Sequence, residues 1–172
     1  MTETITVPTN KAELLAYTEG RWRALVAFTD ALSDAEWMSP TDAAGWSVRD
    51  HVAHLVTWVR AEIALLQHRT PLQQSAGIPE ALWRAGDFDP INEEIRQQTM
   101  NDTPATVRGE RDQVFHKLIE VESRMSDADF ARPATDFGLA EHGKSLLTAL
   151  TEYHGDHFEA HRGYVERIIA KD

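Results

Sequence analysis

Three histidines in two separate segments have the type and spacing of metal ligands. His157 and His161 lie four residues apart, and on a helix such residues project side by side, about 6 Å apart along the axis. Two imidazoles placed in this way can bind one metal ion, and a helix carrying His54 would supply a third ligand. Three protein ligands leave coordination positions open for water or substrate, which is typical of a reactive metal site.

Residues about one helical turn from these histidines are candidates for lining the pocket. His51 and His154 each lie three residues from a proposed ligand, and Trp58 and Tyr153 each lie four residues from one. Metal-bound imidazoles usually donate their second N–H to a carboxylate or carbonyl, and the carboxylates within helical reach are Asp50, Glu62, Glu152 and Asp156. The alternatives are solvent exposure for the polar residues and core packing for the two aromatic residues.

The alternative to a metal site is a polar seam between two helices, in which Glu and hydroxyl groups are the partners of the imidazoles. The other three histidines have no partner pattern and are expected at the surface: His68, His116 and His142. The other four tryptophans are predicted to serve packing alone: Trp22, Trp37, Trp46 and Trp83. The acidic segment 87–89 lacks the ligand run of a calcium loop and is interpreted as a helix cap formed by Asp89.

Apolar periodicity predicts four long helices and no strand. The first runs from about residue 10 to 32, and the second runs from Ser47, with Asp50 as its capping partner, until Pro71 stops it. Thr103 and Pro104 have the types of an N-cap and a first helical residue, so a third helix is predicted to about residue 125. The last helix is predicted from about residue 144 to the C-terminus. The 72–102 connection is predicted to hold short extra helices, one at residues 79–84 and one opening at residues 89–90, with loop elsewhere up to residue 89.

An internal similarity follows the first and third of these helices. Residues 32–40 (LSDAEWMSP) match residues 125–133 (MSDADFARP), with the same spacing from serine to proline. Both are predicted to be short capped turns that end in an aromatic plug. The chain therefore reads as two related helical hairpins, each with histidines on its second helix. Packing the hairpins about a pseudo-twofold axis would bring those two helices together, as a shared metal requires.

Composition limits the class of protein and its partners. The 172 residues suit one domain, residues 1–172, and the absence of cysteine excludes thiolate nucleophiles and cysteine-type zinc sites. The formal net charge of −11 predicts neither a nucleic-acid partner nor an anionic membrane. Residues 1–8 lack a basic start and an apolar run, and no segment approaches the roughly 18 apolar residues of a membrane span, so a cytoplasmic location is expected.

Residues 46–55 (WSVRDHVAHL) and the His157–His161 pair resemble the DinB/YfiT-like superfamily of four-helix metalloproteins. The superfamily pattern is Trp-Ser, an acidic residue three positions later and a closing His-Leu, followed by His-x-x-x-His on the last helix. Residues 7–15, residues 86–92 and the Glu-rich last helix are most similar to the ClbS/DfsB-like branch. The resemblance covers essentially the whole chain, and it implies an all-α, up-and-down four-helix bundle with His54, His157 and His161 as metal ligands.

The same resemblance implies a function. Many members of the superfamily bind a divalent metal, commonly zinc or nickel, through three histidines, and the characterised ones are often thiol-dependent transferases. The named member of the ClbS-like branch instead protects against a cyclopropane-bearing genotoxin by hydrolytic ring opening and need not use a metal. This chain keeps all three histidines, which makes it more similar to the metal-binding majority.

These observations predict a metal-dependent enzyme, a transferase or hydrolase, that activates a low-molecular-weight thiol or water against a small electrophile in detoxification. Because the chain has no cysteine, the thiol must arrive as a cosubstrate. The alternatives are a non-catalytic protein that sequesters a small molecule and a ClbS-like toxin self-protection protein. A structural metal is disfavoured because structural zinc normally has four ligands. The expected partner is a small molecule, and a homodimer is left open.

Overall fold

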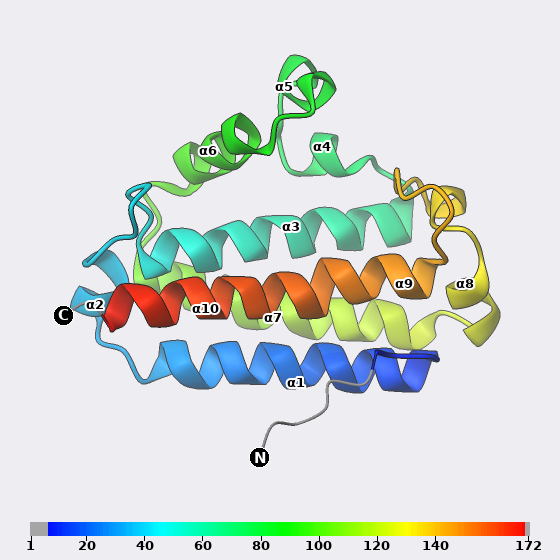
Figure 1. Cartoon of the computed structure of the whole chain (residues 1–172), viewed down its shortest axis with the longest axis horizontal. Coiled ribbons are helices and arrows are strands. Elements are labelled where there is room, and N and C mark those ends of the chain that lie inside the picture. Colours follow the sequence, from blue (N-terminus) through cyan, green and yellow to red (C-terminus); the bar gives the residue numbers. More distant parts are fainter. Residues whose placement is uncertain (1–6, 171–172) are drawn as a thin grey trace.

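The chain folds into a bundle of helices (Figure 1), and the computed structural model describes residues 7–170. The bundle consists of α1 (Lys11–Asp30), α3 (Val48–His68), α7 (Pro104–Arg124) and a last helix that comprises α9 (Leu146–Thr151), the π-helical segment η2 (Glu152–Asp156) and α10 (His157–Ile169). The described residues contain no strand, only isolated bridges from Thr41 to Ser47 and from Pro133 to Ser145. The predicted all-α four-helix bundle is confirmed.

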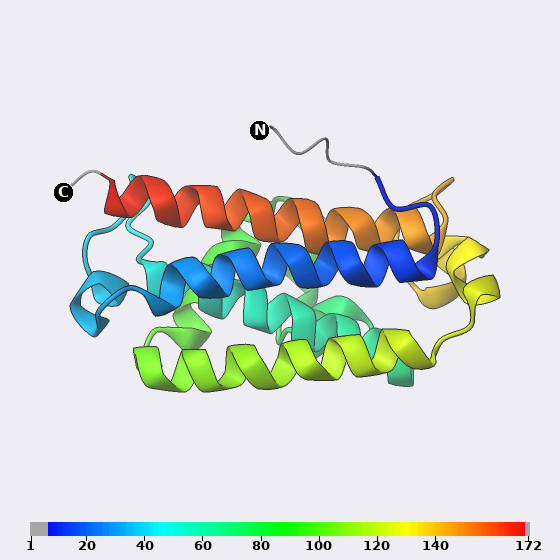
Figure 2. The same ribbon diagram turned by 90° about the horizontal axis from the view of Figure 1, so that it is seen from below.

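The long connection between α3 and α7 sets the directions of the helices. Figures 1 and 2 show α3 and α7 running one way, and α1 and the last helix running the other way. At the start of α3, Arg49 donates to the carbonyl of Met100, just before α7. At the start of α1, Lys11 donates to the carbonyl of Met125, just after α7. The directions are therefore up, down, down, up along the chain. The expected alternation of an up-and-down bundle does not hold, because the long connection returns the chain to the end at which α3 begins.

Three short helices occupy this connection and arch over α3 in Figure 1: α4 (Leu72–Ser75), α5 (Glu80–Ala85) and α6 (Phe88–Thr99). The prediction of short extra helices between residues 72 and 102 is therefore confirmed, although the segment predicted as loop also contains α4. The cap of α6 is Asp87, whose carboxylate accepts the backbone N–H of Asp89. The prediction of Asp89 as the cap was wrong, because the helix begins earlier.

The internal similarity corresponds to two equivalent turns, α2 (Asp34–Met38) and α8 (Asp127–Ala131). Each begins with a capping box, formed by Ser33 and Glu36 in one and by the serine and aspartate of residues 126 and 129 in the other. The aromatic plugs, Trp37 and Phe130, are both buried. The predicted turns are confirmed, and each leads through an isolated bridge into a histidine-bearing helix.

Capping side chains lie at the starts of the long helices, largely at the predicted residues. Asn10 caps α1, Ser47 forms a capping box with Asp50 at α3, and Thr103 caps α7. Ser145 caps the last helix, so its first residue lies slightly later than predicted. None of the helices among residues 7–170 is long and apolar enough to cross a membrane. Residues 1–6 and 171–172, the ends of the predicted domain, lie outside the described residues.

Candidate metal centre

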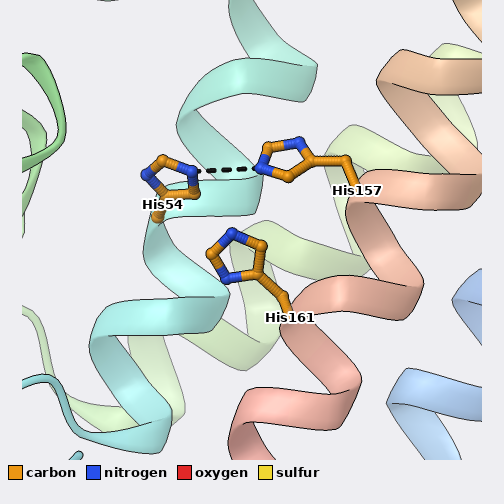
Figure 3. A group of neighbouring side chains, drawn as sticks. All are labelled: His54, His157 and His161. Atoms are coloured by element: carbon orange, nitrogen blue, oxygen red, sulfur yellow. Dashed lines mark hydrogen bonds between the residues drawn. The ribbon is translucent and has the colours of Figure 1, made fainter. Parts of the chain in front are cut away.

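His54 on α3 and His157 and His161 on α10 converge between the two helices (Figure 3). One ring nitrogen from each residue lies within 4.8 Å of the others. Nε2 of His54 is 3.2 Å from Nε2 of His157, and the rings of His54 and His161 stack with centroids 4.7 Å apart. His54 and His161 are buried, and His157 is half-buried. The three histidines singled out by their spacing therefore form one cluster.

Two of the three donor atoms have the spacing of ligands of a tetrahedral divalent ion. Two nitrogens bound to zinc at 2.0–2.1 Å in tetrahedral geometry lie about 3.3–3.4 Å apart. The Nε2 atoms of His54 and His157 are separated by 3.2 Å. At this distance two imidazole lone pairs repel each other unless a proton or a cation lies between them. The cluster thus has the donors, the spacing and the burial of a site that could hold a metal.

Burial keeps these imidazoles neutral. Burial and then the neighbouring histidines hold the pKa of His54 and of His161 well below its usual value. Burial also lowers the pKa of His157 to about 4, and the charge of His154 adds to this effect. A neutral imidazole is the form that binds a metal. Near neutral pH the cluster is therefore in its metal-binding protonation state.

A second histidine and a carboxylate orient His161. Nδ1 of His51 is 3.1 Å from Nδ1 of His161, and Nε2 of His51 is 3.2 Å from Oδ2 of Asp42. The carboxylate favours a proton on Nε2 of His51, so that its Nδ1 accepts the Nδ1–H of His161. This tautomer, assigned from the network, leaves Nε2 of His161 as the nitrogen with a lone pair for a metal.

The carboxylate of Asp42 is itself held in place. Its other oxygen, Oδ1, accepts the backbone N–H groups of Ala44 and Trp46 at 2.9 Å each. The sequence interpretation missed Asp42. A signal was available, because an aspartate that precedes a glycine turn by a few residues commonly accepts local backbone N–H groups.

The other two ligand candidates are oriented by different contacts. His157 lies one turn after Tyr153, whose backbone raises the pKa of His157 and so favours a proton on its ring. The ring of His54 lies edge-on to Trp46 and Trp58, with centroids 5.5 and 6.2 Å away. The rings therefore restrict His54 by packing, and the prediction that Trp46 serves packing alone was wrong, since this ring also borders the histidine cluster.

Two residues predicted for the pocket lie behind it in the bundle core. His154 is fully buried, with Nε2 2.8 Å from Glu62 and Nδ1 3.5 Å from Glu122. Thr18 on α1 completes this group, with its hydroxyl 3.4 Å from Nδ1 of His154. We call Thr18, Glu62, Glu122 and His154 the buried polar cluster. Of the other predicted carboxylate partners, Asp50 caps α3 and pairs with Arg49, and Asp156 accepts the hydroxyl of Tyr17.

Burial opposes the charged form of His154, but the carboxylates of Glu62 and Glu122 outweigh this effect and raise its pKa. Burial likewise raises the pKa of Glu122. The folded protein therefore holds protons here that the unfolded chain would release. The buried polar cluster belongs to the bundle core and does not line the chambers beside the histidine cluster.

The π-helical segment η2 places His154 in the bundle core rather than beside the histidine cluster. Hydrogen bonds in a π turn span five residues rather than four, so residues within the segment, including His154, lie on a different face from the one that α-helical spacing to His157 predicts. Gly155 within η2 is in close contact with α1, because a Cβ at this position would be 1.7 Å from Cε1 of Tyr17. Any other residue at this contact between the last helix and α1 would require the ring of Tyr17 to move.

Two open chambers meet at the histidine cluster. The polar chamber, with a volume of about 540 Å³, is bordered by the three histidines together with Asp42, Trp46, His51, Asp89, Glu93 and Tyr164. The aromatic chamber, with a volume of about 290 Å³, is lined by the rings of Trp58, Trp83, Phe88 and Tyr153 and by the carboxylates of Glu141 and Glu152. His157 borders both chambers. Trp58, Tyr153 and Glu152 thus line a chamber beside the cluster, as does Trp83, for which only packing was predicted.

The fold and the cluster together define a four-helix-bundle protein with three convergent histidines that could hold a metal. The family model of the DinB superfamily matches residues 17–165, and the chain belongs to this superfamily. The superfamily is metal-associated, which agrees with the donor set. The predicted superfamily membership is confirmed.

Solved structures with the same fold include two members of the predicted branch. The colibactin self-resistance protein ClbS, solved in complex with a double-stranded DNA, is 15% identical, with a TM-score of 0.72 over 95% of this chain and 98% of that one. DfsB, described as a sibling lethal factor precursor, is 10% identical, with a TM-score of 0.78 over 95% and 97% of the two chains. A Streptococcus pneumoniae protein is 10% identical, with a TM-score of 0.75 over 96% and 93%. No curated protein matches the chain in sequence.

The structure of ClbS with DNA corrects one prediction. The net charge of −11 was taken to exclude a nucleic-acid partner, but a protein of this fold was solved in complex with double-stranded DNA. The physical reason is that net charge sums the whole surface, whereas contact with phosphates requires only a local group of Lys and Arg. The exclusion of nucleic acid was wrong.

Proposed function

We propose that the protein binds one divalent metal ion, zinc or nickel, through His54, His157 and His161, and catalyses the reaction of a low-molecular-weight thiol or water with a small electrophile. The observation that carries the proposal is the convergence of three neutral imidazoles where two open chambers meet. A divalent ion held by three neutral ligands supplies Lewis acidity and lowers the pKa of a bound thiol or water. A cytoplasmic location belongs to the proposal, because thiols are kept reduced there.

The side chains of the protein would hold and orient the reactants. Asp42 and His51 keep His161 in one tautomer. The polar and aromatic chambers meet at His157, so groups bound in the two chambers would face one point. In the transferase version the new sulfur–carbon bond forms as the bond from that carbon to its leaving group breaks. The thiol proton passes to the leaving group or to solvent.

A second candidate function is non-catalytic capture of a toxic small molecule, in the manner of a self-protection protein. The fold shared with the colibactin self-resistance protein over nearly the full length of both chains supports this candidate. The volumes of the two chambers, about 290 and 540 Å³, suit a small organic molecule. Capture and catalysis differ in the number of molecules consumed per protein chain.

Counting turnovers separates the two functions. Protein loaded with zinc or nickel is incubated with a panel of thiols and a generic alkylating electrophile, and the product per chain is measured. We expect many products per chain from the metal-loaded protein and background from His161→Ala, with the exposed His68→Ala on α3 as a matched control that keeps full activity. Product that stops at one molecule per chain would support capture instead.

A further inference from the structure

The aromatic chamber beside the histidine cluster is built from rings on four separate elements. Trp58 comes from α3, Trp83 from α5, Phe88 from the start of α6 and Tyr153 from η2. The ring centroids of Trp58 and Trp83 are 6.4 Å apart at an interplanar angle of 45°, and those of Trp83 and Phe88 are 6.5 Å apart at 77°. Rings inclined to one another in this way form a curved wall rather than a flat stack.

The faces of these rings are not occupied by the protein's own cations. Among residues 7–170, the arginines that lie over aromatic rings contact Tyr17, Trp37, Phe137 and Tyr164. None lies over a ring of the aromatic chamber. No arginine of the described chain therefore competes with an external positive charge for these π faces.

Charge in both chambers has the same sign. The aromatic chamber includes Glu141 and Glu152, and the polar chamber includes three more carboxylates at residues 42, 89 and 93. No Lys or Arg of the described chain lines either chamber. Lys144 pairs with Glu141 and Glu152, and Arg96 pairs with residue 93, so in the metal-free protein two cations offset five carboxylates and about three negative charges remain. A bound divalent ion would lower this to about one. An anionic molecule would be repelled from this site, and a cation would be attracted.

We propose that the aromatic chamber binds a quaternary or substituted ammonium group, so that the substrate of the site is an organic cation. Aromatic rings combined with carboxylates are the combination that recognises such a group, which is too weakly hydrated to be held well by carboxylates alone. The volume of about 290 Å³ accommodates a small ammonium head group. With this group anchored against Trp58 and Trp83, the rest of the molecule extends past His157 to the histidine cluster. The use of this ligand as a substrate rests on the proposed function, whereas its binding does not.

A matched pair of probes tests the binding step. Choline and 3,3-dimethylbutan-1-ol have nearly the same shape, but only choline is charged. Binding of each to metal-free protein is measured by isothermal titration calorimetry at constant ionic strength. We expect choline to bind at least tenfold more tightly than the alcohol, and Trp58→Leu to weaken choline binding about tenfold. Equal affinities for the two probes would overturn the proposal.

Two exposed aromatic rings provide variants that should leave the fold intact. Phe88 in the aromatic chamber is 58% exposed, and Tyr164 in the polar chamber is 43% exposed. Phe88→Leu should weaken choline binding several-fold, while Tyr164→Leu should leave it unchanged. The opposite pattern would place the cation in the polar chamber and contradict the proposal. Thermal melts followed by circular dichroism verify folding of each variant.

The two proposals fail in distinguishable ways. His161 borders only the polar chamber, so His161→Ala should bind choline as the parent protein does and fail to bind zinc or nickel. If the parent protein binds choline but neither zinc nor nickel, the proposed function is overturned and the cation site still stands. If the parent protein binds metal but shows no preference for choline over the alcohol, the cation site is overturned and the proposed function still stands.

Discussion

The contact between His51 and His161 predicts a graded loss of metal affinity. His51→Ala removes the group 3.1 Å from Nδ1 of His161, but it removes no proposed ligand. Loss of such an orienting partner typically costs 10- to 100-fold in metal affinity, which corresponds to about 1.4–2.7 kcal/mol. His54→Ala removes one of three ligands, and we expect it to abolish binding. The two histidines are neighbours on α3, so the comparison tests the assignment of ligands directly.

Competition between the protein and a chromophoric zinc chelator measures these affinities. We expect His51→Ala to fall within the 10- to 100-fold window, and Asp42→Asn to cause a smaller loss, because it weakens only the carboxylate that faces His51. His68→Ala, an exposed change on the same helix, should have no effect. Circular dichroism should show the same helical content in all four proteins.

One result would refute the reasoning. If His51→Ala abolished zinc binding while His54→Ala retained it, then the metal would be held by His51 and the two histidines of α10. The tautomer assigned to His161 would then be wrong, since its Nδ1 would face the ion. Equal and complete loss in both variants would indicate that His51 is a fourth ligand.

Three further predictions concern the ligands, the helix contact and the buried polar cluster. His157→Ala and His161→Ala should each abolish zinc binding while far-ultraviolet circular dichroism is retained; global unfolding of both would make the metal structural. Gly155→Ala should lower the free energy of unfolding in urea by about 1–3 kcal/mol, because its Cβ would overlap Tyr17, and an unchanged midpoint would contradict the contact. In the buried polar cluster the pKa is raised to about 9 for His154 and to about 7 for Glu122. The folded state therefore binds more protons than the unfolded chain. The proton on Glu122 stabilises the fold mainly between pH 4.5 and 7, whereas the proton on the histidine does so between 6.5 and 9. From pH 7 to 9 the histidine therefore carries the effect, and the stability of metal-free protein should fall by at most about 1.4 kcal/mol per pH unit. Glu122→Gln should flatten this fall, and a parent protein whose stability rises over the same range would show that the sign is wrong.

Local patterns were sufficient to predict the bundle and the cluster of three histidines. Capping residues such as Ser47 and Thr103 fix the helix starts, and the i,i+4 spacing of His157 and His161 places both on one face. The repeated turns at residues 32–40 and 125–133 indicated that the two histidine-bearing helices would meet. These signals involve only a few residues each, so they can be recognised without knowledge of the tertiary structure.

The residues that surround the histidine cluster could not be predicted, because their positions depend on features that leave no local pattern in the sequence. His154 was expected beside His157, but the π-helical segment η2 shifts it into the core with Glu62. An extra residue in one helical turn leaves the apolar pattern nearly unchanged, but it rotates the side chains within that turn relative to those that follow, such as His157. The aromatic chamber similarly depends on how the 72–102 connection folds back over α3, which brings Trp83 near Trp58. Such long-range packing is not encoded in periodicity.

Metal stoichiometry tests the central claim most directly. Purified protein is stripped with a chelator, loaded separately with zinc and with nickel, dialysed, and analysed by inductively coupled plasma mass spectrometry. The convergence of His54, His157 and His161, with two of their ring nitrogens 3.2 Å apart, predicts about one bound ion per chain for at least one of the two metals. Loading with neither metal would contradict the account, and the three histidines would then form only a polar seam between α3 and α10.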